Sequence, residues 1–85
     1  MSLWLTGDAS WLAVPGRAET VELPHSAPLS ELRDTIAAAG AMTVCTQCAA
    51  RRDIAEADLI SGARIAGSAS FVAEILDPGA QALVY

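Results

Sequence analysis

Short apolar runs and longer amphipathic segments alternate along the chain. The short runs predict strands at residues 2–5, 19–23, 42–45, 63–66 and 81–85. Segments with apolar residues three or four positions apart predict helices at 28–39, 48–52 and 68–76, and a brief helical turn is expected at 10–12. Because strands that alternate with helices typically form a parallel sheet covered by helices, the pattern predicts a small α/β fold with a mostly parallel, three-layer sheet.

Residues at the expected helix ends support these boundaries. Gly40 stands where the helix at 28–39 should stop, and Asp8 and Ser68 are placed to cap the turn at 10–12 and the last helix. The Asp-Pro-Gly run at 77–79 predicts a type II turn after that helix. We expect the apolar stripe of the last helix to belong to the core: Phe71, Val72, Ile75 and Leu76.

The length and composition limit the chain to one small domain. Its 85 residues are 53% hydrophobic, which is ample for a core, although many of these residues are alanines that bury little area each. A chain this short buries only about 60% of its unfolded surface, so its stability is expected to be modest. Association with other copies would add to it.

The charge balance excludes two classes of partner. Five basic residues stand against ten acidic residues, for a net charge of -5, and the chain has no lysine. We therefore expect neither nucleic acid nor an anionic membrane as a partner, because phosphate binding depends on clustered Lys and Arg. The sequence shows neither a membrane span nor an export signal, so we expect a cytoplasmic protein. In such a reducing compartment, paired cysteines are more often redox-active or metal-binding than structural.

The segment from Cys45 to Arg52 carries the most chemical information. Cys45 ends a predicted buried strand, and a helix is expected to begin directly after it. Backbone N–H groups and the helix dipole at such a junction favour thiolate over thiol. Cys48 follows at a spacing that brings two sulfurs together in a first helical turn, and Arg51 adds positive charge beside Arg52.

Simpler explanations exist for each of these residues. Free cysteines are often small buried apolar residues, and the Arg51-Arg52 pair is by default a solvated helix face. A closed zinc site within one chain is not expected, because the two cysteines and His25 supply at most three of the four ligands required. His25 lies in a loop, where it either orients a substrate or is simply exposed. A thioredoxin-like pair is open, although the aromatic and proline residues usual beside that motif are lacking.

The run from Cys45 to Ile54 resembles the DsrE/DsrF-like family, which includes the TusD-type sulfur relay subunits. In that family a cysteine ends a strand, and an Arg-Arg pair follows six and seven residues later, as Arg51 and Arg52 do here. The resemblance thus nominates Cys45 as the sulfur-carrying residue. Cys48 is a departure, since relay members can have alanine at this position.

The resemblance implies a flavodoxin-like fold in a single domain spanning residues 1–85. Family members usually open with one more strand and helix, and this chain is expected to begin at the family's second strand. In a flavodoxin-like order the first strand would lie in the middle of the sheet, so a gap is expected there. Three explanations are open: a truncation, which we favour, a partner chain that fills the gap, or a different strand order.

Three functional hypotheses follow. The first, implied by the resemblance, is a sulfur-handling protein in which Cys45 accepts sulfane sulfur as a persulfide from a donor protein and passes it to an acceptor protein. It needs no bound cofactor, and the resemblance implies a homo-oligomer. The second is a thiol-disulfide redox protein or sensor that uses Cys45 and Cys48 together. The third is a non-catalytic oligomeric interaction module in which the cysteines are incidental.

Overall fold

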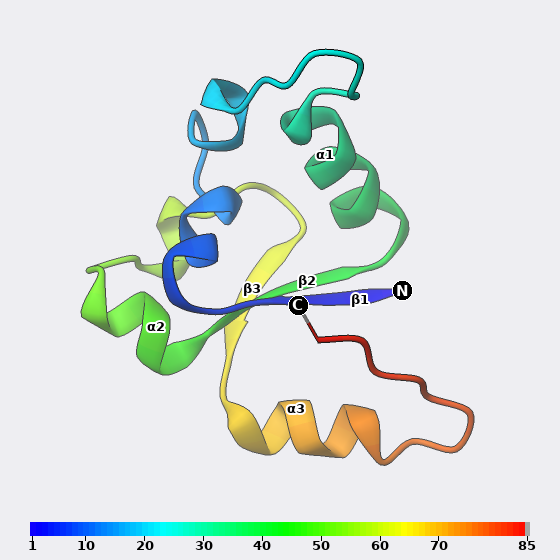
Figure 1. The fold of residues 1–85 in the computed structure, drawn as a ribbon. Helices are drawn as coiled ribbons and strands as arrows, with labels where there is room; N and C mark the ends of the chain where they lie inside the picture. Colours follow the sequence, from blue (N-terminus) through cyan, green and yellow to red (C-terminus); the bar gives the residue numbers. More distant parts are fainter. Residues whose placement is uncertain (85) are drawn as a thin grey trace.

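The computed structural model describes residues 1–84, which form a three-stranded parallel sheet with helices on both faces (Figure 1). The elements, with η for a 3-10 helix, are β1 (Ser2–Leu5), η1 (Gly7–Ala13), η2 (Ala18–Thr20), α1 (Leu29–Ala39), β2 (Ala41–Cys45), α2 (Thr46–Arg51), η3 (Glu56–Asp58), β3 (Ala63–Ala66) and α3 (Ser68–Ile75). The predicted three-layer α/β fold is confirmed, and the arrangement is consistent with a flavodoxin-like fold.

The described strands of the sheet follow one another without a gap. The sheet runs β1-β2-β3, and β1 pairs directly with β2 from Ser2 opposite Ala41 to Leu5 opposite Val44. The expected gap in the middle of the sheet is therefore wrong for the described chain.

One face of the sheet holds the hydrophobic core. The register sets Leu5, Val44 and Ile65 in one row across the three strands, and η1, α1 and α2 cover this face. The fully enclosed members are small or medium-sized, which agrees with an alanine-rich composition: Leu5, Ala13, Met42, Val44, Ala49 and Ile54. These contacts fix β2 and the start of α2.

The other face is polar and is covered by α3 (Figure 1). Trp4, Thr43 and Arg64 form one row across the three strands, because successive side chains of a strand point to opposite faces. From α3, Phe71 packs edge-on against Trp4 with ring centroids 5.3 Å apart, and Glu74 accepts a 2.7 Å hydrogen bond from the Trp4 indole. One face of the sheet is thus an aliphatic core, whereas the other combines an aromatic contact with polar side chains.

The prediction of a strand at 19–23 is wrong. Residues Ala18–Thr20 form η2, and local hydrogen bonds explain why: the Thr20 hydroxyl donates to the Arg17 carbonyl at 2.7 Å, and Glu19 accepts the Gly16 N–H at 3.1 Å. Short polar side chains that bond their own backbone compete with strand pairing. Leu23 is left 69% exposed.

The C-terminal predictions have a mixed outcome. The type II turn is confirmed, since Gly79 has φ +86° and the Ala80 N–H donates to the Asp77 carbonyl at 3.0 Å. The strand at 81–85 is wrong for the described residues 81–84, which pair with no strand and are exposed, while Tyr85 lies outside the described residues. The expected core stripe is also wrong in part: Phe71 is half-buried, but Val72, Ile75 and Leu76 are exposed.

Two helix ends differ from expectation. Thr6 rather than Asp8 precedes η1, and Gly67 rather than Ser68 is the N-cap of α3. The stop at Gly40 is confirmed, and glycine is required there for a steric reason, because a side chain would collide with the Met1 carbonyl oxygen. Gly40 therefore lets the first residue lie against the start of β2.

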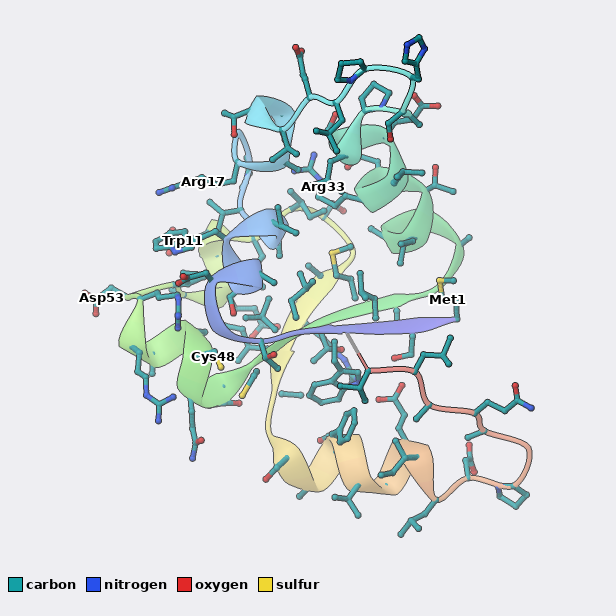
Figure 2. The ribbon with its side chains drawn as sticks, in the orientation of Figure 1. Met1, Trp11, Arg17, Arg33, Cys48 and Asp53 are labelled. Carbon is teal, nitrogen blue, oxygen red and sulfur yellow. The ribbon has the colours of Figure 1, made fainter. Side chains whose placement is uncertain are left out.

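A buried arginine ties α1 to the two 3-10 helices (Figure 2). Arg33 is 7% exposed; its Nη1 donates to Glu19 at 2.8 Å and to the Leu12 carbonyl at 3.4 Å, and its Nε donates to Asp34 at 3.0 Å. Because a buried charge is tolerated only when it is paired, these three acceptors explain how the arginine is accommodated. They hold the first crossover in place above the sheet.

Candidate functional site

The candidate site lies where β1 and β2 end. The two strands are parallel neighbours, so their carboxyl ends meet at one edge of the sheet. The chain leaves β1 into η1 at Gly7 and leaves β2 into α2 directly after Cys45. The cysteine pair therefore faces a segment that lies far from it in sequence.

Cys45 occupies the N-cap position of α2 and is half-buried. The pKa of its thiol is lowered, first by the backbone N–H of Cys48, then by the Cys48 thiol, the Gln47 N–H and the positive charge of Arg51, against an opposing effect of burial. Within the described residues the Cys45 side chain makes no capping hydrogen bond to the first turn of α2, so these N–H groups act on the thiol without a regular N-cap bond. The arrangement favours a thiolate at Cys45, as the sequence predicted.

Cys48 is held from outside its own helix. It is half-buried on the first turn of α2, and its sulfur accepts the backbone N–H of Gly7 at 3.2 Å (Figure 2). Gly7 has φ +56°, a left-handed conformation that favours glycine. Both cysteines are free thiols. Cys45 and Cys48 thus belong to the same first turn of α2, and Gly7 is a contact of Cys48 from outside the helix.

The two arginines have different environments. Arg52 is 21% exposed; it forks onto one Asp8 oxygen from Nε at 3.2 Å and from Nη2 at 2.9 Å, and its Nη1 donates to the Cys48 carbonyl at 3.0 Å. Arg51 is exposed and acts on the Cys45 thiol through its charge. Arg52 therefore ties η1 to α2, whereas Arg51 is the arginine that supports the thiolate.

The end of α2 is also fixed. The Ile54 N–H donates to the Ala49 carbonyl at 2.9 Å and the Asp53 N–H to the Ala50 carbonyl at 3.2 Å, which is the hydrogen-bond pattern of a Schellman motif. Asp53 takes the left-handed position of that motif with φ +53°, and Ile54 is buried. The short helix that carries Cys48 is thus anchored at its C-terminal end by a core contact.

His25 lies apart from the cysteines. It is exposed, has φ +62° and belongs to the loop between η2 and α1, which Figure 1 shows at the top of the molecule while α2 lies at the lower left. Among residues 1–84, no hydrogen bond or ion pair joins His25 to either cysteine. A binding role for His25 stays a prediction.

Gly7 and Asp8 were not expected to belong to the site. A signal for them is present in the sequence, because they directly follow the strand at 2–5 and the carboxyl ends of parallel strands gather at one edge. Within the described part of the chain, no three His, Cys, Asp or Glu side chains gather as a metal site would require. No helix of residues 1–84 has the length and apolar character needed to cross a membrane.

A parallel α/β sheet with a thiol pair at the carboxyl end of its central strand defines the class of this protein. Comparison with family models gives a match to the DsrE/DsrF-like family over residues 1–85. The chain belongs to the DsrE/DsrF-like family, which points to a role in sulfur relay in general. Comparisons with curated proteins and with solved structures gave no match.

Proposed function

We propose that the protein carries sulfane sulfur as a persulfide on Cys45. The observation that carries the proposal is the environment of this thiol: backbone N–H groups, the Cys48 thiol and the charge of Arg51 all lower its pKa. A thiolate is the nucleophile in thiol exchange. Cys45 is half-buried, so part of its side chain is accessible to a donor. Membership in a family with a general sulfur-relay role supports the same reading.

The chemistry requires a donor and an acceptor. The Cys45 thiolate attacks the sulfane sulfur of a donor persulfide, takes over that sulfur and releases the donor as a thiolate. An acceptor thiolate then attacks the outer sulfur of the Cys45 persulfide and leaves Cys45 as a thiolate again. Both steps are thiol exchanges between protein sulfurs, so the proposal needs no bound cofactor.

Mass spectrometry after treatment with inorganic polysulfide tests this function. We expect an adduct of about 32 Da, the mass of one sulfur atom, on Cys45. Cys48→Ser should keep the adduct and Cys45→Ser should lose it. Gln47→Ala is the matched control, because it changes an exposed residue between the two cysteines and keeps both thiols. If the adduct is found solely on Cys48 in the wild type, or if Cys48→Ser takes no adduct on Cys45, a carrier role for Cys45 is excluded.

A second candidate function is that of a thiol-disulfide redox protein, which the position of both free cysteines on the first turn of α2 favours. The same experiment separates the two functions. A redox pair loses about 2 Da, corresponding to two hydrogens, without passing through a sulfur adduct on Cys45 in any variant. If Cys45→Ser leaves partner binding and cellular phenotype intact, a non-catalytic interaction module is favoured instead.

We propose self-association as part of either function. The exposed apolar side chains of α3 and its C-cap support it, since Val72 is 46%, Ile75 41% and Leu76 74% exposed. Contiguous exposed apolar surface on a small domain commonly marks a protein contact. Light scattering of purified protein should give a mass that is a multiple of 8.8 kDa, and Leu76→Glu should reduce it.

A further inference from the structure

Cys48 lies against the sulfur that the proposed function uses. Cys45 is the N-cap of α2, and Cys48 is three residues further on, where side chains of a helix face one another. Both side chains belong to the first turn of α2, and the Cys48 thiol is one of the groups that lower the pKa of Cys45. Any persulfide formed on Cys45 keeps Cys45 Sγ as its inner atom, three residues from Cys48 on this turn.

The surrounding structure keeps Cys48 in that place. The Gly7 N–H donates to Cys48 Sγ at 3.2 Å from a different crossover, and Arg52 joins the same two segments through Asp8 and the Cys48 carbonyl. These contacts restrict where the sulfur of Cys48 can lie. Cys48 is thus held in a fixed position on α2, where its sulfur can act as a second nucleophile.

On the basis of the proposed Cys45 persulfide, we propose that Cys48 is a resolving thiol that releases the carried sulfur as hydrosulfide. The Cys48 thiolate attacks the inner sulfur, Cys45 Sγ, and a Cys45–Cys48 disulfide bond forms. The bond between Cys45 Sγ and the outer sulfur breaks, and its electron pair leaves with the outer sulfur, which keeps its proton as HS⁻. The cysteine pair supplies the two electrons that reduce the sulfane sulfur.

The step needs no external oxidant, and the resulting disulfide returns to two thiols by exchange with a dithiol reductant. It competes with relay, because an acceptor protein attacks the outer sulfur while Cys48 attacks the inner one. The CxxC pair would therefore limit the lifetime of the persulfide when no acceptor is bound. Sulfide release is an activity distinct from passing sulfane sulfur to another protein.

A single-turnover experiment on the full chain tests the proposal. The protein is pulsed with inorganic polysulfide at pH about 8 and rapidly desalted, and samples are taken at intervals into acid, where thiols are protonated and exchange is slow. We expect the wild type to lose the sulfur adduct at least about tenfold faster than Cys48→Ser. It should release one equivalent of sulfide and end as a disulfide lighter by about 2 Da. Gln47→Ala should behave as the wild type.

The outcomes separate this inference from the proposed function. If the wild type keeps its Cys45 adduct as long as Cys48→Ser does, Cys48 is not a resolving thiol, while persulfide carriage stands. If neither variant ever takes an adduct on Cys45, the proposed function fails and the inference with it. Cys48→Ala serves as a second variant, because a serine hydroxyl can retain the hydrogen bond to Gly7; circular dichroism confirms that each variant is folded.

Discussion

The backbone N–H of Gly7 donates to the sulfur of Cys48 across 3.2 Å, although the two residues are 41 positions apart in the sequence. Gly7 begins η1 and Cys48 lies on α2, so the bond joins the segments that follow two neighbouring parallel strands. The Arg52–Asp8 pair joins the same segments at 2.9 Å. The cysteine pair is therefore part of a small tertiary site and does not depend on a helical turn alone.

The pKa of Cys45 predicts a pH-dependent contribution to stability. Because the folded pKa of this thiol lies below its unfolded value, the unfolded chain binds more protons between the two values. The contribution is fully present above the unfolded pKa and is lost as the pH falls through the folded pKa. We expect the difference in free energy of unfolding between the wild type and Cys45→Ser, measured in urea, to grow from pH 6 to pH 9. A difference that shrinks over this range would contradict a lowered pKa.

Arg51 and Arg52 are expected to respond differently to the same substitution. Arg51→Gln removes a charge that lowers the pKa of Cys45, so the pH profile of Cys45 alkylation should shift upward. Arg52→Gln should leave that profile nearly unchanged. It should cost less than about 1 kcal/mol of stability for the ion pair, because Asp8 is 93% exposed. Equal shifts in the alkylation profile for both variants would show that the assignment of roles is wrong.

Much of the fold could be predicted because its signals are local. The strands at 2–5 and 63–66 have their predicted bounds, and α1 ends at Gly40 as expected. The prediction of a strand at 19–23 was wrong because the Glu19 carboxylate accepts a hydrogen bond from Gly16 and the Thr20 hydroxyl donates one to Arg17. Periodicity does not register such local bonds. The expected gap in the sheet was wrong for a different reason: pairing between strands is a tertiary property.

The site was predicted in part for the same reasons. The spacing of Cys45 and Cys48 and the position of the first after a strand are sequence properties, so their proximity was recoverable. The distinction between Arg51 and Arg52 was not, because it depends on Asp8, which reaches Arg52 only through the pairing of β1 with β2. Gly7 was missed since backbone donors carry no side-chain signal.

Asp53→Gly is expected to stabilise the protein. Asp53 holds φ +53° at the end of α2, where glycine adopts the left-handed conformation without the cost of a Cβ. The substitution also removes a negative charge from a helix C-terminus. We expect a gain of about 1 kcal/mol in the free energy of unfolding. Ala50→Gly is the matched control in the same helix; it should cost about 1 kcal/mol, because its backbone is helical. A loss of stability in Asp53→Gly would contradict the Schellman geometry.

Acid is expected to loosen α3 from the sheet through Glu74. The pKa of this carboxyl is lowered, first by the Ser2 hydroxyl, then by the Trp4 indole and by the charge of Arg64. The carboxylate thus stabilises the fold above the unfolded pKa of glutamate, and this contribution is lost as the pH falls through the lower folded value. The apolar contact that remains, Phe71 on Trp4, is partly exposed and covers a small area.

Trp4 fluorescence measures this release directly. Trp11→Phe removes the other indole, which lies under Arg17 rather than α3, so the remaining emission reports on the sheet face. On acidification from pH 6 to pH 3 we expect a red shift as water reaches Trp4. Glu74→Gln in this background should be red-shifted already at pH 7 and should lose most of the pH response, whereas Glu56→Gln should retain it, since Glu56 is exposed on η3. If Glu74→Gln keeps both the emission and the acid response of its parent, α3 is held by the Trp4–Phe71 contact and not by the carboxylate.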